Sequence, residues 1–138
     1  MIMKLKSIIA AYKALGEAKV TKLEASEVLK IVKARKAMRP YAEDYDAFLK
    51  DCQEKFQPKN FEEIQEKVQK WDSLTDDEKK VVNKVLVEYN NAINSAILEE
   101  IGKDIELNVE KLSEDSLAKI IQENGWELKK LDELEVLI

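Results

Sequence analysis

The fold is decided by residues 75–102, which read TDDEKKVVNKVLVEYNNAINSAILEEIG. Thr75 followed three residues later by Glu78 forms a capping box, in which each side chain accepts a hydrogen bond from a backbone N–H at the start of a helix. The two aspartates between them place negative charge at the positive end of the helix dipole. Apolar residues then recur on one side, and a glycine follows. This pattern predicts a helix that begins at Asp76 and ends near Ile101.

Two short segments alternate apolar and polar residues, which is the period of a half-buried strand. They are Met1–Lys6 at the start of the chain and Ile105–Val109 after the long helix. A lone strand leaves its backbone hydrogen-bonding groups without partners, so we expect the two segments to pair. The predicted fold class is α+β and predominantly α-helical, with several amphipathic helices and one small two-stranded β-sheet. We expect residues 1–138 to form a single domain.

Capping residues also predict helices near the N-terminus. Ser7 is expected to cap a short apolar helix that Gly16 ends. Thr21 and Glu24 form another capping box, which predicts a helix start near Lys22.

Apolar residues at steps of three and four then continue from Val28 to Phe56, across Pro40. Proline removes a backbone donor and disfavours helical geometry at the preceding residue. The apolar face also changes direction near residues 34–38. Two interpretations stay open, namely one long helix kinked at Pro40 or two helices that meet there.

Three further helices complete the predicted fold. One begins at Asn60 and carries apolar residues up to Trp71. The next is capped by Ser113 and stopped by Asn124-Gly125. Leucines at regular helical steps predict a last helix over residues 126–137.

Composition excludes many enzyme classes. The chain has no histidine, one cysteine and three isolated glycines. Without imidazole there is no Ser–His or Cys–His nucleophile, and catalytic zinc sites nearly always need one. The single Cys52 forms neither an intramolecular disulfide nor a Cys-x-x-Cys pair, and isolated glycines make no phosphate-binding loop. We therefore expect a protein that is not an enzyme, with no cofactor and no bound metal.

Charge is distributed unevenly along the chain. Residues 1–40 carry ten Lys and Arg against three Glu, whereas the rest of the chain carries 13 basic and 25 acidic residues. Either the basic segment neutralises the acidic remainder within the fold, or it binds an anionic partner such as nucleic acid. At about 100° per residue the candidate contacts surround much of a helix, which favours a diffuse positive surface over a single stripe. These candidates are Lys30, Lys33, Arg35, Lys36 and Arg39.

Two other groups of residues are candidates for a protein interface. Tyr41 and Tyr45 fall at apolar helical spacing, which places them in the core or at an interface. Asn90, Asn91 and Asn94 are unusually polar for the middle of a long helix. They indicate either a face that meets another chain or the solvent side of the helix.

The N-terminal part also resembles a known group of proteins. The order Met3-Lys4-Leu5-Lys6, then IIAAYKAL, then a basic helix over Lys22–Lys36, is similar to small proteins encoded in phages and prophages. That family is of unknown function, and the resemblance covers residues 1–60. It implies an accessory or assembly role in a phage.

Together these features predict a non-catalytic protein–protein interaction or assembly protein, whose partner is another protein or a second copy of itself. The alternative is a nucleic-acid-associated adaptor or regulator that uses the basic N-terminal segment. No apolar stretch is long enough to span a membrane, and the N-terminus lacks the apolar region of a signal peptide. We expect no membrane partner, and a location in the cytoplasm, or in the virion if the protein is of phage origin.

Overall fold

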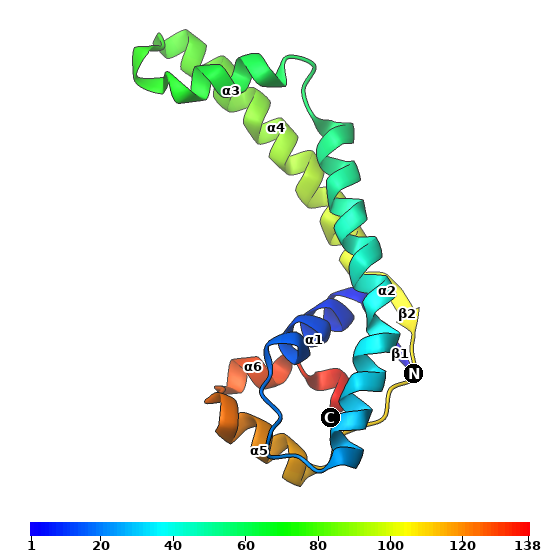
Figure 1. The fold of residues 1–138 in the computed structure, drawn as a ribbon. Coiled ribbons are helices and arrows are strands. Elements are labelled where there is room, and N and C mark those ends of the chain that lie inside the picture. Colours follow the sequence, from blue (N-terminus) through cyan, green and yellow to red (C-terminus); the bar gives the residue numbers. More distant parts are fainter. The chain divides into compact units, whose positions relative to one another are not determined.

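The protein is predominantly helical, with one small antiparallel sheet, so the predicted fold class is confirmed. The structure is a computed structural model that describes all 138 residues (Figure 1). Its elements, in chain order, are β1 (Ile2–Lys4), α1 (Leu5–Glu17), α2 (Ala25–Phe56), α3 (Phe61–Gln69), the 3₁₀ helix η1 (Trp71–Ser73), α4 (Asp76–Ile101), β2 (Asp104–Glu106), α5 (Glu114–Asn124), α6 (Leu128–Asp132) and the 3₁₀ helix η2 (Glu135–Leu137).

The sheet joins the N-terminal segment to the segment after α4, as the sequence predicts. β1 and β2 pair antiparallel, with Met3 opposite Ile105. The second strand is Asp104–Glu106 and not Ile105–Val109. The N–H of Leu107 donates to the carbonyl of Met1 at 3.0 Å. Because this register places no residue of β1 opposite Asn108 or Val109, the second strand ends before them.

Helix α1 begins earlier than predicted, and the predicted Ser7 cap is wrong. The helix follows β1 without a loop, and Lys4 at the N-cap position makes no side-chain capping bond. The N–H of Leu5 instead donates to the carbonyl of Lys103 at 3.0 Å, because the strand pairing brings that carbonyl to the helix start. The hydroxyl of Ser7 donates to the Glu135 carboxylate at 2.8 Å.

The predicted capping box at Thr21 and Glu24 is also wrong. Helix α2 begins at Ala25, and the carbonyl of Glu24 accepts the N–H of Val28 at 3.1 Å. The Thr21 hydroxyl donates to the Glu123 carboxylate on α5. A bond to a distant element therefore replaces the local cap.

Helix α2 continues through Pro40 as one helix of 32 residues. The interpretation of two helices that meet at Pro40 is therefore wrong. Met38 and Ala42 are buried on either side of the exposed Pro40, so the packed face persists across the proline. Proline lacks the N–H that would donate to the carbonyl of Lys36, so one hydrogen bond of the helix is missing.

Two predicted caps are confirmed. The Glu78 N–H donates to the Thr75 hydroxyl at 3.2 Å, and the Glu78 carboxylate accepts from Thr75, so α4 starts where the capping box predicts. Ser113 accepts the N–H of Ser116 at 3.1 Å, and Gly125 ends α5 at φ 62°. That positive φ suits glycine because it has no Cβ.

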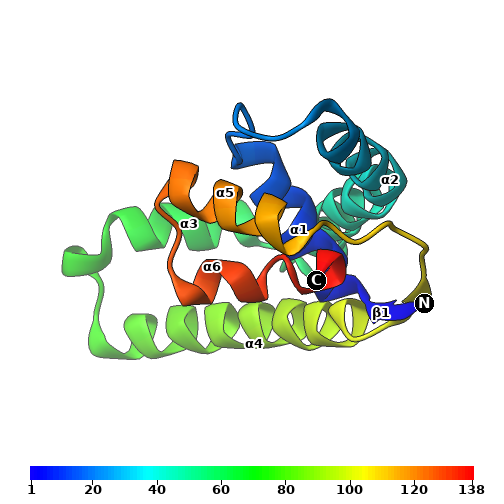
Figure 2. The same cartoon turned by 90° about the horizontal axis from the view of Figure 1, so that it is seen from below.

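The C-terminal segment is less regular than the predicted helix over residues 126–137. It forms the short α6 and then η2, in which Val136 and Leu137 are buried. Helix η2 packs against α1, so both chain ends lie in the same part of the protein (Figure 2).

The chain divides into two compact units, and the single domain stays a prediction. Unit 1 is Met1–Asp46 with Ile101–Ile138, and unit 2 is Ala47–Glu100. In unit 1, α1 lies among α2, α5 and α6 (Figure 1). Its core is apolar and includes Ile8, Met38, Ile120, Leu134 and Leu137, all fully buried.

Unit 2 contains the end of α2, together with α3 and nearly all of α4. Its core is small, and its buried residues are Cys52, Ile64 and Val82. The hydroxyl of Tyr89 donates to the carbonyl of Gln53 at 3.3 Å. These contacts define the inner side of α4 as the side that carries Val82 and Tyr89. No helix of either unit has the combination of length and apolar character needed to cross a membrane.

Candidate interaction surfaces

The outer side of α4 carries a stripe of four exposed residues, Val87, Asn91, Asn94 and Leu98, which we call the α4 stripe. At about 100° per residue they fall within about 60° of the helix circumference, and their centre lies about 150° from the buried Val82. Leu98 is 68% exposed and Val87 is 47% exposed. The stripe therefore presents two large apolar side chains on the side that faces away from the core of unit 2.

The α4 stripe lies in a segment that is almost free of charge. Between Lys84 and Glu99 the single charged residue is Glu88, in a chain of which 37% of residues are charged. Depletion of charged residues distinguishes the centre of a protein interface from ordinary surface. The composition of the stripe is therefore typical of an interface and not of a solvated helix face.

The sequence prediction placed Asn90, Asn91 and Asn94 at an interface or on the solvent side. All three are exposed, and their amides form no hydrogen bond within the chain. Asn91 and Asn94 belong to the α4 stripe, whereas Asn90 is turned about 100° from Asn91. Val87 and Leu98 are not among the interface residues that the sequence predicts. The sequence could have revealed them, because both are apolar residues that fall on the opposite side of the helix from its apolar inner face.

The two candidate tyrosines belong to unit 1, whereas the α4 stripe belongs to unit 2. Tyr41 is half-buried and packs against the core of unit 1. Tyr45 is also half-buried and lines a groove along α1. The predicted interface residues therefore belong to different surfaces.

The structure separates the five basic candidates on α2 into two groups. Lys30 pairs with Glu27 at 3.4 Å, and the Arg35 guanidinium lies 4.7 Å from the centre of the Tyr12 ring. The other three residues are exposed and form no ion pair with the chain's own acids. They are Lys33, Lys36 and Arg39.

These three basic residues lie on one side of the first part of α2, within about 120° of its circumference. Leu29 and Val32 are exposed on the same side, at 52% and 54%. We call this set, Leu29, Val32, Lys33, Lys36 and Arg39, the α2 basic surface. It is narrower than the diffuse surface predicted from all five candidates, because Lys30 and Arg35 have partners within unit 1.

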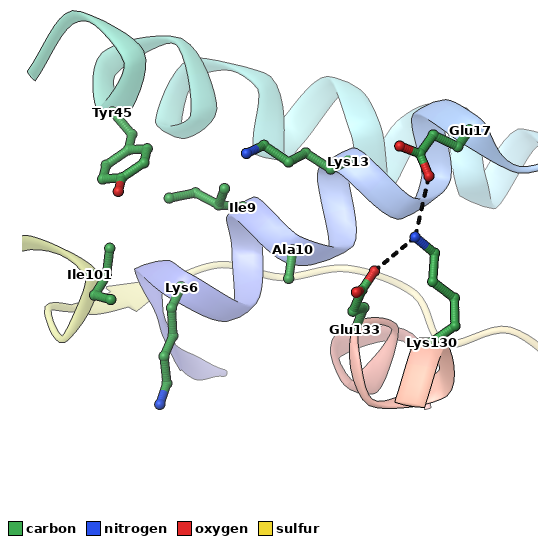
Figure 3. Close-up of a pocket in the computed structure, with 9 residues that line it drawn as sticks. All are labelled: Lys6, Ile9, Ala10, Lys13, Glu17, Tyr45, Ile101, Lys130 and Glu133. Atoms are coloured by element: carbon green, nitrogen blue, oxygen red, sulfur yellow. Dashed lines mark hydrogen bonds and ion pairs between the residues drawn. The ribbon is translucent and has the colours of Figure 1, made fainter. Parts of the chain in front are cut away.

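A groove of about 400 Å³ runs along α1 in unit 1 (Figure 3). At one end the Lys130 ammonium lies 3.2 Å from a Glu17 oxygen and 3.1 Å from a Glu133 oxygen. The hydrogen bonds to Glu133 and then Glu17 raise the pKa of Lys130, so it stays protonated and joins α1 to the C-terminal segment. Lys6 and Lys13 point to opposite sides of α1 (Figure 3), so their charges do not converge on one ligand position.

Comparison of the chain with protein-family models, with curated proteins and with solved structures gives no match. The chain's two candidate interaction surfaces are the α4 stripe in unit 2 and the α2 basic surface in unit 1.

Proposed function

We propose that this protein is a non-catalytic interaction or assembly protein that binds another protein chain through the α4 stripe. The observation that carries the proposal is the exposed outer side, formed by the α4 stripe, of the nearly charge-free segment between Lys84 and Glu99. A helix surface in water normally carries charged side chains, whereas this one carries Val87 and Leu98 separated by two asparagines.

The two apolar side chains of the stripe are by themselves too few to give a stable complex. Full burial of a Val or Leu side chain contributes about 1.5–3 kcal/mol, and both residues are already partly covered. Association loses about 4–15 kcal/mol of translational and rotational freedom. The partner must therefore bury both apolar residues together and also satisfy the amides of Asn91 and Asn94. A partner that offers both apolar side chains and hydrogen-bonding amides is therefore favoured over a surface that is only apolar.

An affinity capture experiment tests this proposal. Tagged full-length protein, the variant Leu98→Glu and the control Gln65→Glu are each expressed in the native host, and retained proteins are identified by mass spectrometry. Gln65 is exposed on α3, so the control adds the same charge to unit 2 outside the α4 stripe. We expect the wild type and the control to retain at least one protein, the untagged chain included, that Leu98→Glu loses. Identical sets from all three proteins contradict the proposal.

A second candidate function is binding of nucleic acid, and the α2 basic surface favours it. Lys33, Lys36 and Arg39 are exposed and unpaired, so each is free to contact a phosphate. Fluorescence anisotropy with labelled duplex DNA and single-stranded RNA, at about 50 and about 200 mM salt, measures this contribution. Binding that weakens steeply with salt, and less steeply in Lys33→Glu/Lys36→Glu, supports the role. No binding at the lower salt concentration rejects it.

The resemblance of the N-terminal part to phage and prophage proteins supports an accessory role in phage assembly. We include in the proposal a location in the cytoplasm, or in the virion if the gene is of phage origin. Detection of the protein in purified particles by mass spectrometry distinguishes the two locations.

A further inference from the structure

We infer that the α4 stripe binds the same stripe of a second copy of this chain, with the two α4 helices antiparallel about a two-fold axis between Ala92 and Ile93. This inference rests on the proposed function and identifies the partner of the α4 stripe as a second copy of the chain. Helix α4 is a single unbroken helix over this region (Figure 2), so the stripe is presented on one regular surface.

The spacing of the stripe is symmetric about that point. Its residues are separated by steps of four, three and four, which is the spacing of a two-helix seam. In the antiparallel pair, Val87 lies opposite Leu98 of the second copy, and Asn91 lies opposite Asn94 of the second copy. Every position of the stripe therefore meets a residue of its own chemical kind, as a self-complementary two-fold interface requires.

The asparagines fit this arrangement because each amide carries both hydrogen-bond donors and an acceptor. Asn91 and Asn94 form no hydrogen bond within the chain, so both amides are available. A pair of facing amides satisfies itself without any charged partner. Polar residues in a helical seam also fix its register, since any shift would place an amide against Val87 or Leu98.

The charges beyond the stripe favour the antiparallel orientation over the parallel one. Lys80 and Lys84 continue the same side of α4 toward its N-terminus, and both are exposed. In a parallel pair each lysine would meet its own copy. In the antiparallel pair Lys84 lies opposite Ile101 of the second copy, in the C-terminal turn where the negative end of the helix dipole favours a cation.

The α2 basic surface does not offer an equivalent self-contact. Pairing it with itself would bring Lys33, Lys36 and Arg39 against the same three cations of the second copy, and like charges facing each other oppose association. The α4 stripe carries no charge and so lacks this repulsion.

Sedimentation velocity over a wide concentration range tests the inference. We expect the full-length chain to approach the mass of a dimer as its concentration rises. Leu98→Lys should weaken this association by at least about tenfold, because the two-fold axis places the new charge at two positions. The control Gln65→Lys on α3 should associate like the wild type. A wild-type protein that stays monomeric at every concentration overturns the inference, as does dimerisation that Leu98→Lys leaves unchanged.

Disulfide trapping tests the orientation. Separately tagged Asn91→Cys and Asn94→Cys proteins are mixed under mild oxidation, with the wild type as the control for the buried Cys52. The antiparallel register predicts mainly the mixed disulfide between position 91 and position 94. If each variant links mainly to itself, the parallel arrangement is correct and the inference fails.

The two proposals fail separately. If the chain is monomeric but affinity capture still finds a different protein that Leu98→Glu loses, the α4 stripe has another partner. In that case the proposed function stands and the second copy is rejected. Circular dichroism melting of each variant distinguishes a lost contact from a lost fold.

Discussion

Arg35 of α2 lies over the ring of Tyr12 on α1, with 4.7 Å between its guanidinium carbon and the ring centre. The same guanidinium passes close to Gly16, where a Cβ would lie 3.1 Å from the Arg35 Nη2 atom. Helices α1 and α2 therefore meet through a cation and an aromatic ring, next to a residue without a side chain. Arg35 acts within unit 1 as a structural contact between its two longest helical segments.

Replacing Arg35 should separate the contribution of its charge from that of its stem. We expect Arg35→Ala to lower the free energy of unfolding by about 1–3 kcal/mol, because both the cation–π contact and the packed methylene groups are lost. Arg35→Met keeps most of the packing and should lower it by about half as much. Urea unfolding followed by circular dichroism measures both values. Equal losses in the two variants would show that packing contributes nothing.

Gly16 offers a test of the same contact from the other helix. Alanine is normally about 0.5–1 kcal/mol more stable than glycine inside a helix, so Gly16→Ala should stabilise α1 if space allows. In the wild type the guanidinium must shift, so we expect little or no gain. In the Arg35→Ala background the full gain should appear. A double-mutant cycle measured by urea unfolding gives the coupling between the two positions, and the absence of coupling would contradict the contact.

The bond between Thr21 and Glu123 should appear in the dependence of stability on pH. The Thr21 hydroxyl donates to the Glu123 carboxylate and holds the pKa of that carboxyl below its ordinary value. The folded state therefore keeps Glu123 ionised at pH values where the unfolded chain already binds a proton. This contribution is fully present above the carboxyl pKa of the unfolded chain, and it is lost as pH falls through the lower folded value.

Thr21→Val removes the hydroxyl and tests this account. The difference in unfolding free energy between wild type and variant should be constant at neutral pH and shrink in the acid range. Urea titrations at a series of pH values measure it. A difference that grows toward acid pH would have the opposite sign and would reject the assignment.

The sequence predicts those elements whose signals are local. Thr75 and Glu78 are three residues apart and need no other part of the chain, so the start of α4 is placed correctly. Ser7 and Thr21 have equally good capping character, but their hydroxyls bond to Glu135 and Glu123, more than 100 residues away. Local spacing carries no information about these partners, so both predicted caps fail.

The candidate surfaces also divide into those with a local sequence signal and those that depend on distant parts of the chain. The asparagines of α4 are visible in the sequence because polar residues in mid-helix are unusual. The separation of Lys33 and Lys36 from Arg35 is not visible, since it depends on Tyr12 of another helix. The exposure of Leu29 and Val32 is likewise not visible in the sequence, because it depends on which side of α2 packs against α1.

Replacing Pro40 distinguishes a continuous α2 from two helices that meet. If the helix is continuous, Pro40→Ala supplies the missing N–H to the Lys36 carbonyl and removes a residue that costs roughly 3 kcal/mol inside a helix. Alanine also makes the unfolded chain more flexible, which offsets about 0.4–1 kcal/mol of that gain. Pro40 is exposed, so no core packing is lost. We expect a net stabilisation of about 2–2.6 kcal/mol in urea unfolding.

The opposite sign would have a definite meaning. If two helices met at Pro40, alanine would gain no hydrogen bond and would lose the stiffness that proline gives the unfolded chain, so stability would fall. Glu43→Ala is the matched control, because Glu43 is exposed on the same helix and its replacement leaves the backbone bonds intact. Amide hydrogen exchange adds a direct readout, since a continuous helix protects the new N–H at position 40 to the same degree as its neighbours.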